Sequence, residues 1–360
     1  MTQPTSPGRE FRLISADGHV SEPRDLYESR TPKKWRDRVP HVEHRQDGDF
    51  WVIPGSSFPP RPITEVTPGT YDAKARLLDL DADGIDAEVL FPNAGPDFAR
   101  ADQDPEFHLA MVQIYNDWIT EFAAVDPNRF GACPILPELG ADVAVAEIER
   151  LVDRPVIAAW LLKSYPHGDT ILNASDDPAW AAIEQTGKPA TIHIGLRANA
   201  GFNFATPLPG TLHFQDAPGR MLEIIFSGVL DRFPTLNVFF AEVDCGWLPY
   251  FAQVSDDNYL RRTRSEVHDM WETPKLSRLP SDYMRERFPA SFITDPFAVK
   301  NRHAVGVERM LWSSDYPHLT TDWPYSWKTV HLTFADVPDD ERYAILAGNA
   351  QRLFGFGLNA

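Results

Sequence analysis

The chain is poor in cysteine and in positive charge. Two cysteines, Cys133 and Cys245, among 360 residues do not make the disulfide framework of a small secreted domain. Lysine and arginine number 34 against 52 aspartates and glutamates, and the net charge is -18. Binding to phosphate backbones needs clustered lysine and arginine, so this balance argues against nucleic acid as a partner. An acidic small molecule remains possible, because a site can be locally positive.

Long apolar runs are also missing. No run approaches the ~20 residues of a membrane span. The first eight residues are polar and lack the apolar stretch of a signal peptide. We therefore expect a cytoplasmic protein without membrane contact.

Short, β-rich apolar runs alternate with amphipathic segments of helical spacing. Parallel strands buried on both faces are expected to read as continuous apolar runs. Eight such runs are present, at 11–17, 85–91, 129–136, 156–163, 189–193, 236–242, 290–294 and 309–315. Helices are predicted at 72–83, 105–125, 141–152, 178–186, 219–233, 246–260, 296–305 and 339–354.

Eight strands and eight helices in alternation favour a closed barrel over an open sheet. The predicted class is α/β, a distorted (β/α)8 TIM barrel formed by one domain over residues 1–360. Three stretches do not fit the alternation: 20–70, 196–218 and 261–288. The first is predicted to be an inserted lid with a hairpin at 42–53. Long irregular segments are usually functional or form subunit contacts, so a homo-oligomer, dimer or higher, is expected.

Acids and histidines stand where several apolar runs end. Asp17 and His19 follow the first run, and residues two apart in a strand face the same way. The glycine between them is expected to let the backbone bend close to a metal ion. His193, Glu242 and Asp315 end three later runs. Imidazoles and carboxylates at the carboxyl ends of barrel strands are what a catalytic metal site requires.

Each of these residues has an ordinary explanation when taken singly. The first motif could be a turn, His193 a core histidine bonded to a carbonyl, and Asp315 a cap. Glu242 would be a buried carboxylate, which is costly unless it is paired or bound to metal. The conjunction at predicted strand ends favours a metal site.

The chain resembles the amidohydrolase superfamily, specifically the amidohydrolase-related group of hydrolases and non-oxidative decarboxylases. The matching segments span nearly the whole chain in order; they are DGHVSEP at 17–23, RLLDLDADGID at 76–86, TIH at 191–193, SDYPH at 314–318 and GNAQRLF at 348–354. The resemblance implies a divalent metal at the mouth of the barrel. Its ligands carry over to Asp17, His19, His193 and Asp315.

The chain departs from the family pattern at two positions. Asp17 stands where the family often has a histidine, and Glu242 where a catalytic histidine often ends the sixth strand. The added carboxylates suit Zn, Fe or Mn. Glu242 could hold a second metal, so one or two ions per chain are expected. Lys163 ends the fourth strand, where other amidohydrolases carry a bridging carboxylated lysine; a salt-bridged lysine is the alternative.

His318, three residues after Asp315, is the best remaining acid/base candidate. Asp315, His318 and Glu242 are the predicted catalytic residues. Further possible site groups are Glu22, His167, Arg197, Asn199, Asp244, Tyr316 and Trp323, and Trp247, Trp323 and Trp327 could wall an apolar pocket.

The leading functional hypothesis is metal-dependent hydrolysis of an amide, ester or thioester of a small carboxylic acid derivative. A divalent metal lowers the pKa of bound water to about 7. Asp315 would accept the water proton, and His318 would stabilise the oxyanion or protonate the leaving group. The alternative is non-oxidative decarboxylation of an aromatic or unsaturated carboxylic acid. A hydratase and a non-catalytic barrel are further alternatives.

Overall fold

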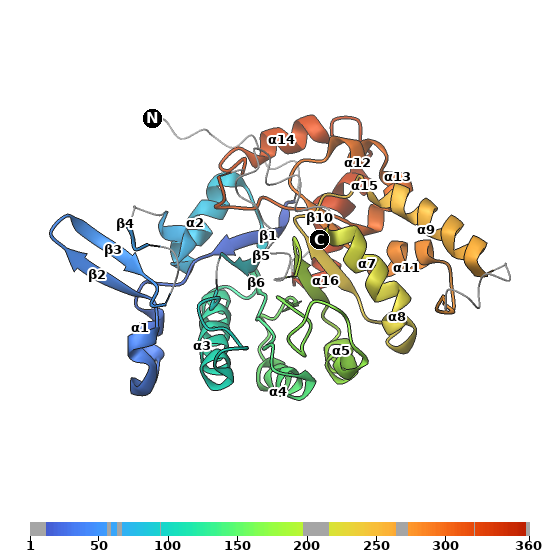
Figure 1. Ribbon diagram of the computed structural model, residues 1–360. Coiled ribbons are helices and arrows are strands. Elements are labelled where there is room, and N and C mark those ends of the chain that lie inside the picture. The colour runs from blue at the N-terminus through green and yellow to red at the C-terminus, as the bar shows by residue number, and fades with distance from the viewer. Residues whose placement is uncertain are drawn as a thin grey trace.

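The computed structural model describes residues 12–55, 59–62, 67–93, 95–196, 216–263, 273–319 and 321–357. Eight parallel strands form its centre, in two sheets of order β1-β5-β6 and β11-β10-β9-β8-β7 (Figure 1). Their residues are almost all buried, as continuous apolar strands should be. The strands are β1 (Ile14–Val20), β5 (Ala87–Pro92), β6 (Phe130–Ala132), β7 (Trp160–Leu161), β8 (Ala190–His193), β9 (Val238–Ala241), β10 (Ala290–Phe292) and β11 (Met310–Trp312).

The two sheets meet at both of their edges. Parallel bridges join Ala132 to Ile157 and Ile135 to Leu161, next to β6 and β7. On the other side, the Asp315 amide donates to the Asp17 carbonyl at 3.0 Å. All eight strands therefore follow one another in the order of a barrel, and the predicted (β/α)8 class is confirmed. The short strands and the breaks in pairing make this barrel distorted.

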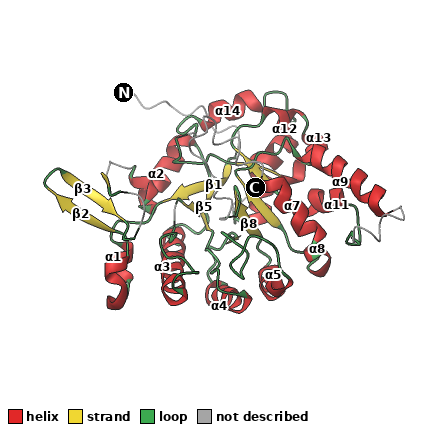
Figure 2. Cartoon of the chain, in the orientation of Figure 1, coloured by secondary structure: helices red, strands yellow, loops and turns green. Residues whose placement is uncertain are grey.

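Helices surround the strands (Figure 2). Most were predicted to within three residues at each end, and Asp72 caps α2 by accepting from the Lys74 and Ala75 amides. The predicted helix at 219–233 is two helices, because Gly228 adopts the left-handed conformation (φ 73°) between them. The α-helices are α1 (Leu26–Arg30), α2 (Ala73–Asp83), α3 (Pro105–Ala123), α4 (Ala141–Leu151), α5 (Asp177–Thr186), α7 (Asp216–Phe226), α8 (Val229–Arg232), α9 (Leu248–Thr263), α11 (Pro280–Arg287), α12 (Pro296–Lys300), α13 (Arg302–Val305), α14 (Ser326–Thr333), α15 (Asp339–Tyr343) and α16 (Asn349–Phe354).

The predicted helices at 296–305 and 339–354 are also interrupted, the second by a π-helical turn at Ala344–Gly348 between α15 and α16. Short 3-10 turns lie at Lys33–Arg38, Pro68–Thr70, Ala174–Asp176 and Val307–Arg309.

The segment after β1 leaves the barrel. It contains α1 and the antiparallel strands β2 (His41–Arg45), β3 (Gly48–Val52) and β4 (Arg61–Pro62). Figure 1 shows the β2–β3 hairpin projecting away from the central strands. Of the candidates in the irregular stretch after β8, Arg197 and Asn199 lie outside the described residues.

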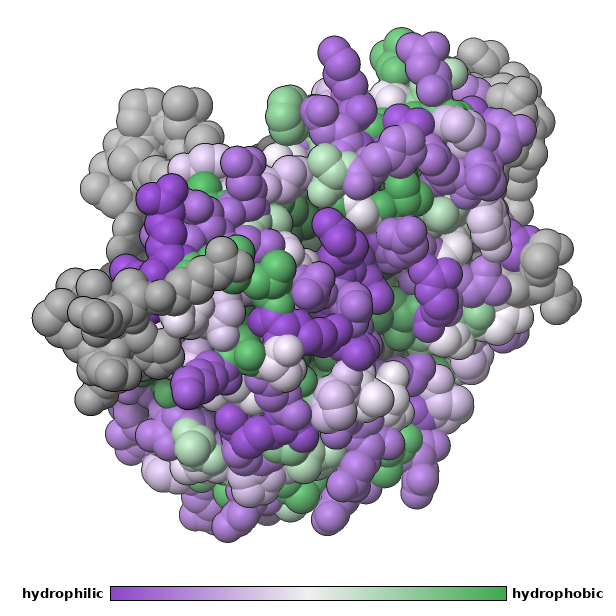
Figure 3. All heavy atoms as spheres, turned by 90° about the vertical axis from the view of Figure 1, so that its right-hand side faces the viewer, coloured by the Kyte–Doolittle hydropathy of each residue, from purple (hydrophilic) through white to green (hydrophobic). Residues whose placement is uncertain are grey.

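On the face in Figure 3, hydrophilic residues predominate and hydrophobic ones occur in small groups. Among the residues with described structure, no helix is both long and apolar enough to cross a membrane.

Candidate metal centre

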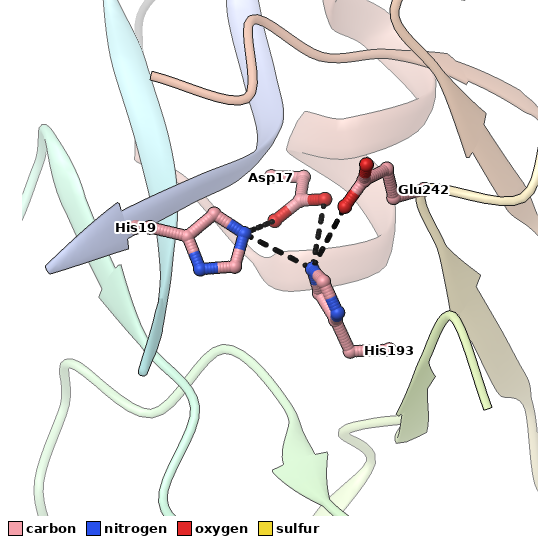
Figure 4. Close-up of side chains that lie close together, drawn as sticks. All are labelled: Asp17, His19, His193 and Glu242. Atoms are coloured by element: carbon pink, nitrogen blue, oxygen red, sulfur yellow. Dashed lines mark hydrogen bonds and ion pairs between the residues drawn. The ribbon is translucent and has the colours of Figure 1, made fainter. Parts of the chain in front are cut away.

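Four predicted ligands converge at the carboxyl ends of the strands (Figure 4). Asp17 and His19 lie on β1, His193 is the last residue of β8, and Glu242 follows β9. One ligand atom from each lies within 4.8 Å of all the others. His193 Nε2 is 3.3 Å from an Asp17 oxygen, 3.5 Å from a Glu242 oxygen and 3.1 Å from His19 Nε2.

Both imidazoles turn their Nε2 atoms toward this centre. His19 Nδ1 lies 3.1 Å from the carbonyl oxygen of Pro92, so Nδ1 carries the proton when the ring is neutral and Nε2 faces the cluster. Burial lowers the pKa of both His19 and His193. Neutral imidazoles with a fixed free nitrogen are the form that binds metal ions.

The surroundings of the Asp17 carboxylate indicate whether a cation would fit among these residues. It is fully buried, and within the described part of the chain neither of its oxygens has a hydrogen-bond partner. Burial raises its pKa to about 7, with the neighbouring Asp315 charge adding to the effect. Burying an ionised carboxylate without hydrogen-bond partners costs free energy. A divalent cation among these donors would remove that cost, so the residues present fit a metal ion.

Asp315 and His318 extend the cluster from the segment after β11. Asp315 Oδ1 lies 3.3 Å from His19 Nε2 and 2.8 Å from His318 Nδ1. The His318 ring stacks on the His19 ring, with centroids 4.0 Å apart. Within this second group, His19, Glu242, Asp315 and His318 also offer ligand atoms within 4.8 Å of one another. His19 and Glu242 are thus shared by two overlapping sets of donors.

The charges of this second group differ from residue to residue. Although burial opposes ionisation, the adjacent His19 and His318 rings hold the pKa of Asp315 well below its usual value. Burial also disfavours protonated His318, but the Asp315 hydrogen bond and nearby carboxylates outweigh it and raise the pKa of His318. Burial raises the pKa of Glu242 to about 8.

Several residues that follow the strands adopt left-handed backbone conformations. Ile194, Glu242, Asp244 and Asp315 have φ values of 59°, 56°, 56° and 54°. Such values cost a non-glycine residue of order 1–3 kcal/mol and cluster at functional sites. The turns that aim Glu242 and Asp315 inward are therefore held by the surrounding fold against local preference.

Gly18 has a different role from the one expected. A Cβ atom at this position would lie 2.0 Å from Glu88 Oε1, so the glycine leaves room for a buried glutamate rather than for a metal ion. β1 also continues to Val20, so Asp17 and His19 lie inside the strand and not beyond its end. The strand's pairing with β5 shifts register between Ser15 and Gly18.

The other candidate residues have structural partners. Lys163 forms an ion pair with Asp97, as the salt-bridge alternative expected. Glu22 accepts from Tyr27 Oη at 2.9 Å, and His167 lies 2.7 Å from Asp176. Tyr316 and Trp323 both contact Asp79. The Trp247 indole donates to the Val243 carbonyl, and Trp327 packs near His331. Burial raises the pKa of Asp244 to about 7. Sequence reasoning missed Glu88 and gave Arg76 no role, although Arg76 opens one of the quoted motifs.

The fold and the donor set define a β/α-barrel protein able to hold a divalent metal ion. The amidohydrolase family model matches residues 54–356, and the chain belongs to that family. The gamma-resorcylate decarboxylase of Polaromonas sp. (strain JS666 / ATCC BAA-500) is 25% identical over 310 residues, covering 79% of this chain and 90% of the relative.

Structures of two decarboxylases are among the solved structures that share the fold. The 5-carboxyvanillate decarboxylase LigW from Sphingomonas paucimobilis matches with a TM-score of 0.71 at 21% identity, over 96% of this chain and 99% of that one. The dihydroxybenzoic acid decarboxylase from Polaromonas sp. JS666, solved with bound manganese and 2-nitroresorcinol, matches with a TM-score of 0.62 at 20% identity, over 97% and 98%.

These comparisons contradict the leading functional prediction. The named relatives are decarboxylases, so the prediction of a hydrolase or thioesterase was wrong. The error came from treating carboxylate-rich ligands as a sign of water activation. The same donors can hold a metal ion that binds a substrate carboxylate instead.

Proposed function

We propose that this enzyme catalyses the metal-dependent, non-oxidative decarboxylation of an aromatic carboxylic acid that carries a hydroxyl group beside the carboxylate. The observation that carries the proposal is the position of His318, a proton carrier held by Asp315 next to the metal donors. The similar proteins support it, since the substrates for which they are named are hydroxylated or methoxylated aromatic acids.

The proposed metal ligands are Asp17, His19, His193, Glu242 and Asp315. A divalent ion, such as the manganese of the Polaromonas structure, would chelate the substrate carboxylate and its neighbouring oxygen. Asp17 and the two histidines would hold this position from opposite strands of the barrel.

We assign the proton transfer to His318. Its ring would give a proton to the carbon that carries the carboxylate. The bond between that carbon and the carboxylate then breaks, its electron pair restores the aromatic ring, and CO₂ leaves. Asp315, 2.8 Å from His318 Nδ1, would hold the ring and favour its protonated form. The His318 side chain is 33% exposed, so solvent can return the proton.

The test is release of CO₂ by protein loaded with Mn²⁺. The panel contains 2,6-dihydroxybenzoate, 2-hydroxybenzoate and 5-carboxyvanillate, with 3-hydroxybenzoate as a control that lacks the neighbouring oxygen. We expect CO₂ from at least one of the first three, none from the control, and loss of activity in Asp315→Asn. Metal-replete protein that releases no CO₂ from any of them would overturn the proposal.

A further inference from the structure

A fully buried ion pair lies directly behind the candidate metal centre. Arg76 on α2 and Glu88 on β5 are both inaccessible to solvent, and the guanidinium donates to Glu88 Oε2 at 2.8 Å. Neither residue is in either group of possible ligands. Replacing a buried ion pair by apolar residues of similar volume is often neutral or stabilising, so its presence needs a reason other than stability.

The remaining donors of Arg76 reach the backbone of the two segments that carry ligands. Nη1 donates to the carbonyl of His19 at 3.0 Å, and Nη2 donates to the carbonyl of Tyr316 at 2.9 Å. The first belongs to a candidate ligand on β1, and the second to the residue after Asp315. The guanidinium also lies over the Tyr316 ring, 4.3 Å from its centroid.

Glu88 fixes the guanidinium in this orientation. Its carboxylate occupies the space opened by Gly18, the residue between Asp17 and His19 on β1. A planar guanidinium can serve a carboxylate and two carbonyls at once, whereas an ammonium group is a point charge without that fork.

We propose that Arg76 is a positioning residue that, held by Glu88, sets the separation between the β1 ligands and Asp315. The proposal rests on the metal site of the proposed function and does not depend on the reaction performed there. Arg76 bonds to the backbone of both ligand-bearing segments. Its loss should therefore loosen the arrangement of the metal-binding side chains without removing any of them.

The test measures Mn²⁺ affinity of metal-free protein by calorimetry, so it does not need an active enzyme. The main variant is the double change Arg76→Met with Glu88→Leu, which leaves no orphaned buried charge. Arg76→Lys is the second variant. Tyr283→Phe on α11 is the control, since it removes hydrogen bonds to Asp231 and Ser277, within a network that includes no candidate ligand.

Partners of ligands that do not touch the metal typically contribute 10- to 100-fold to metal affinity. We expect the double variant and Arg76→Lys to be folded and to bind Mn²⁺ at least tenfold more weakly, with Tyr283→Phe unchanged. A folded Arg76 variant whose affinity stays within twofold of wild type would overturn the proposal. Absence of Mn²⁺ binding by the wild type would overturn its premise, whereas tight binding without CO₂ release would contradict only the proposed reaction.

Discussion

Burial and neighbouring side chains change the pKa values of the site residues in different directions. Asp315 and His318 are three positions apart and share one hydrogen bond, yet the pKa of Asp315 is held low and that of His318 is raised. Such a divergence separates a group that stays ionised from one that carries a proton. We therefore assign the proton to His318 and the anchoring charge to Asp315.

His318→Gln tests that assignment. Loss of a general acid typically lowers the rate by 10²- to 10⁴-fold. We expect kcat for CO₂ release to fall by about this factor, with metal content per chain close to wild type. Elemental analysis beside the kinetics separates the two effects. Loss of metal together with activity would show that His318 is mainly a ligand.

At the scale of the element, α2 contacts the site region by one face. Arg76, Asp79 and Asp83 follow helical spacing, and all three bind the chain between Tyr316 and Ser326. Asp83 accepts from both the amide and the hydroxyl of Ser326. The helix that follows the inserted segment thereby fastens the loop after β11.

Asp83 makes this element sensitive to pH. Burial raises its pKa to about 6 from 3.8, so the folded state binds the proton more tightly than the unfolded state. Its contribution to stability is therefore fully present below pH 3.8 and is lost as the pH rises through about 6. The Asp83→Asn side chain does not ionise, so the variant does not lose stability in this way. Relative to wild type, we expect the variant to gain roughly 1–3 kcal/mol in unfolding free energy between pH 4 and pH 7.

Denaturant unfolding of both proteins at each pH, with a chelator present, measures that difference. A difference between variant and wild type that does not change with pH would contradict a raised pKa for Asp83.

The first strand depends on Gly18 for a steric reason. Gly18→Ala would force the new Cβ against Glu88, and overpacking of this kind costs typically 1–3 kcal/mol. Gly219→Ala is the matched control, because a Cβ there meets nothing within 4 Å and the position lies in α7. Thermal unfolding should show a lower midpoint for the first variant and an equal or higher one for the second. Equal midpoints for both would argue against the close fit between β1 and Glu88.

For the whole molecule, the candidate ligands come from positions 17 to 315 and meet only when the barrel forms. A metal ion bound to this set would favour the folded chain, by about 2.7 kcal/mol at a free concentration 100 times Kd. We expect Mn²⁺ to raise the thermal midpoint of metal-free protein and a chelator to reverse the change. Asp17→Asn should lose most of the response. An equal response in that variant would point to binding elsewhere.

Much of the fold could be predicted from the sequence. The eight strands were predictable because buried parallel strands are short, continuous apolar runs. His193, Glu242 and Asp315 were predictable as candidate ligands because they end such runs, whereas Asp17 and His19 lie inside β1. The interruptions at Gly228 and at Ala344–Gly348 were not, since helical periodicity continues across them. The choice of reaction was also wrong, because one set of donors can serve hydrolysis or decarboxylation.

By itself the sequence determined the barrel class and the identity of Asp17, His19, His193, Glu242 and Asp315 as candidate ligands, since local hydrophobic patterning carries that information. Only the tertiary structure decided which residues hold these candidate ligands in position. Arg76 and Glu88 are twelve residues apart and look like ordinary surface charges in the chain. Their burial, and the contact of Glu88 with Gly18, arise from the packing of α2 and β5 against β1, which no local pattern encodes.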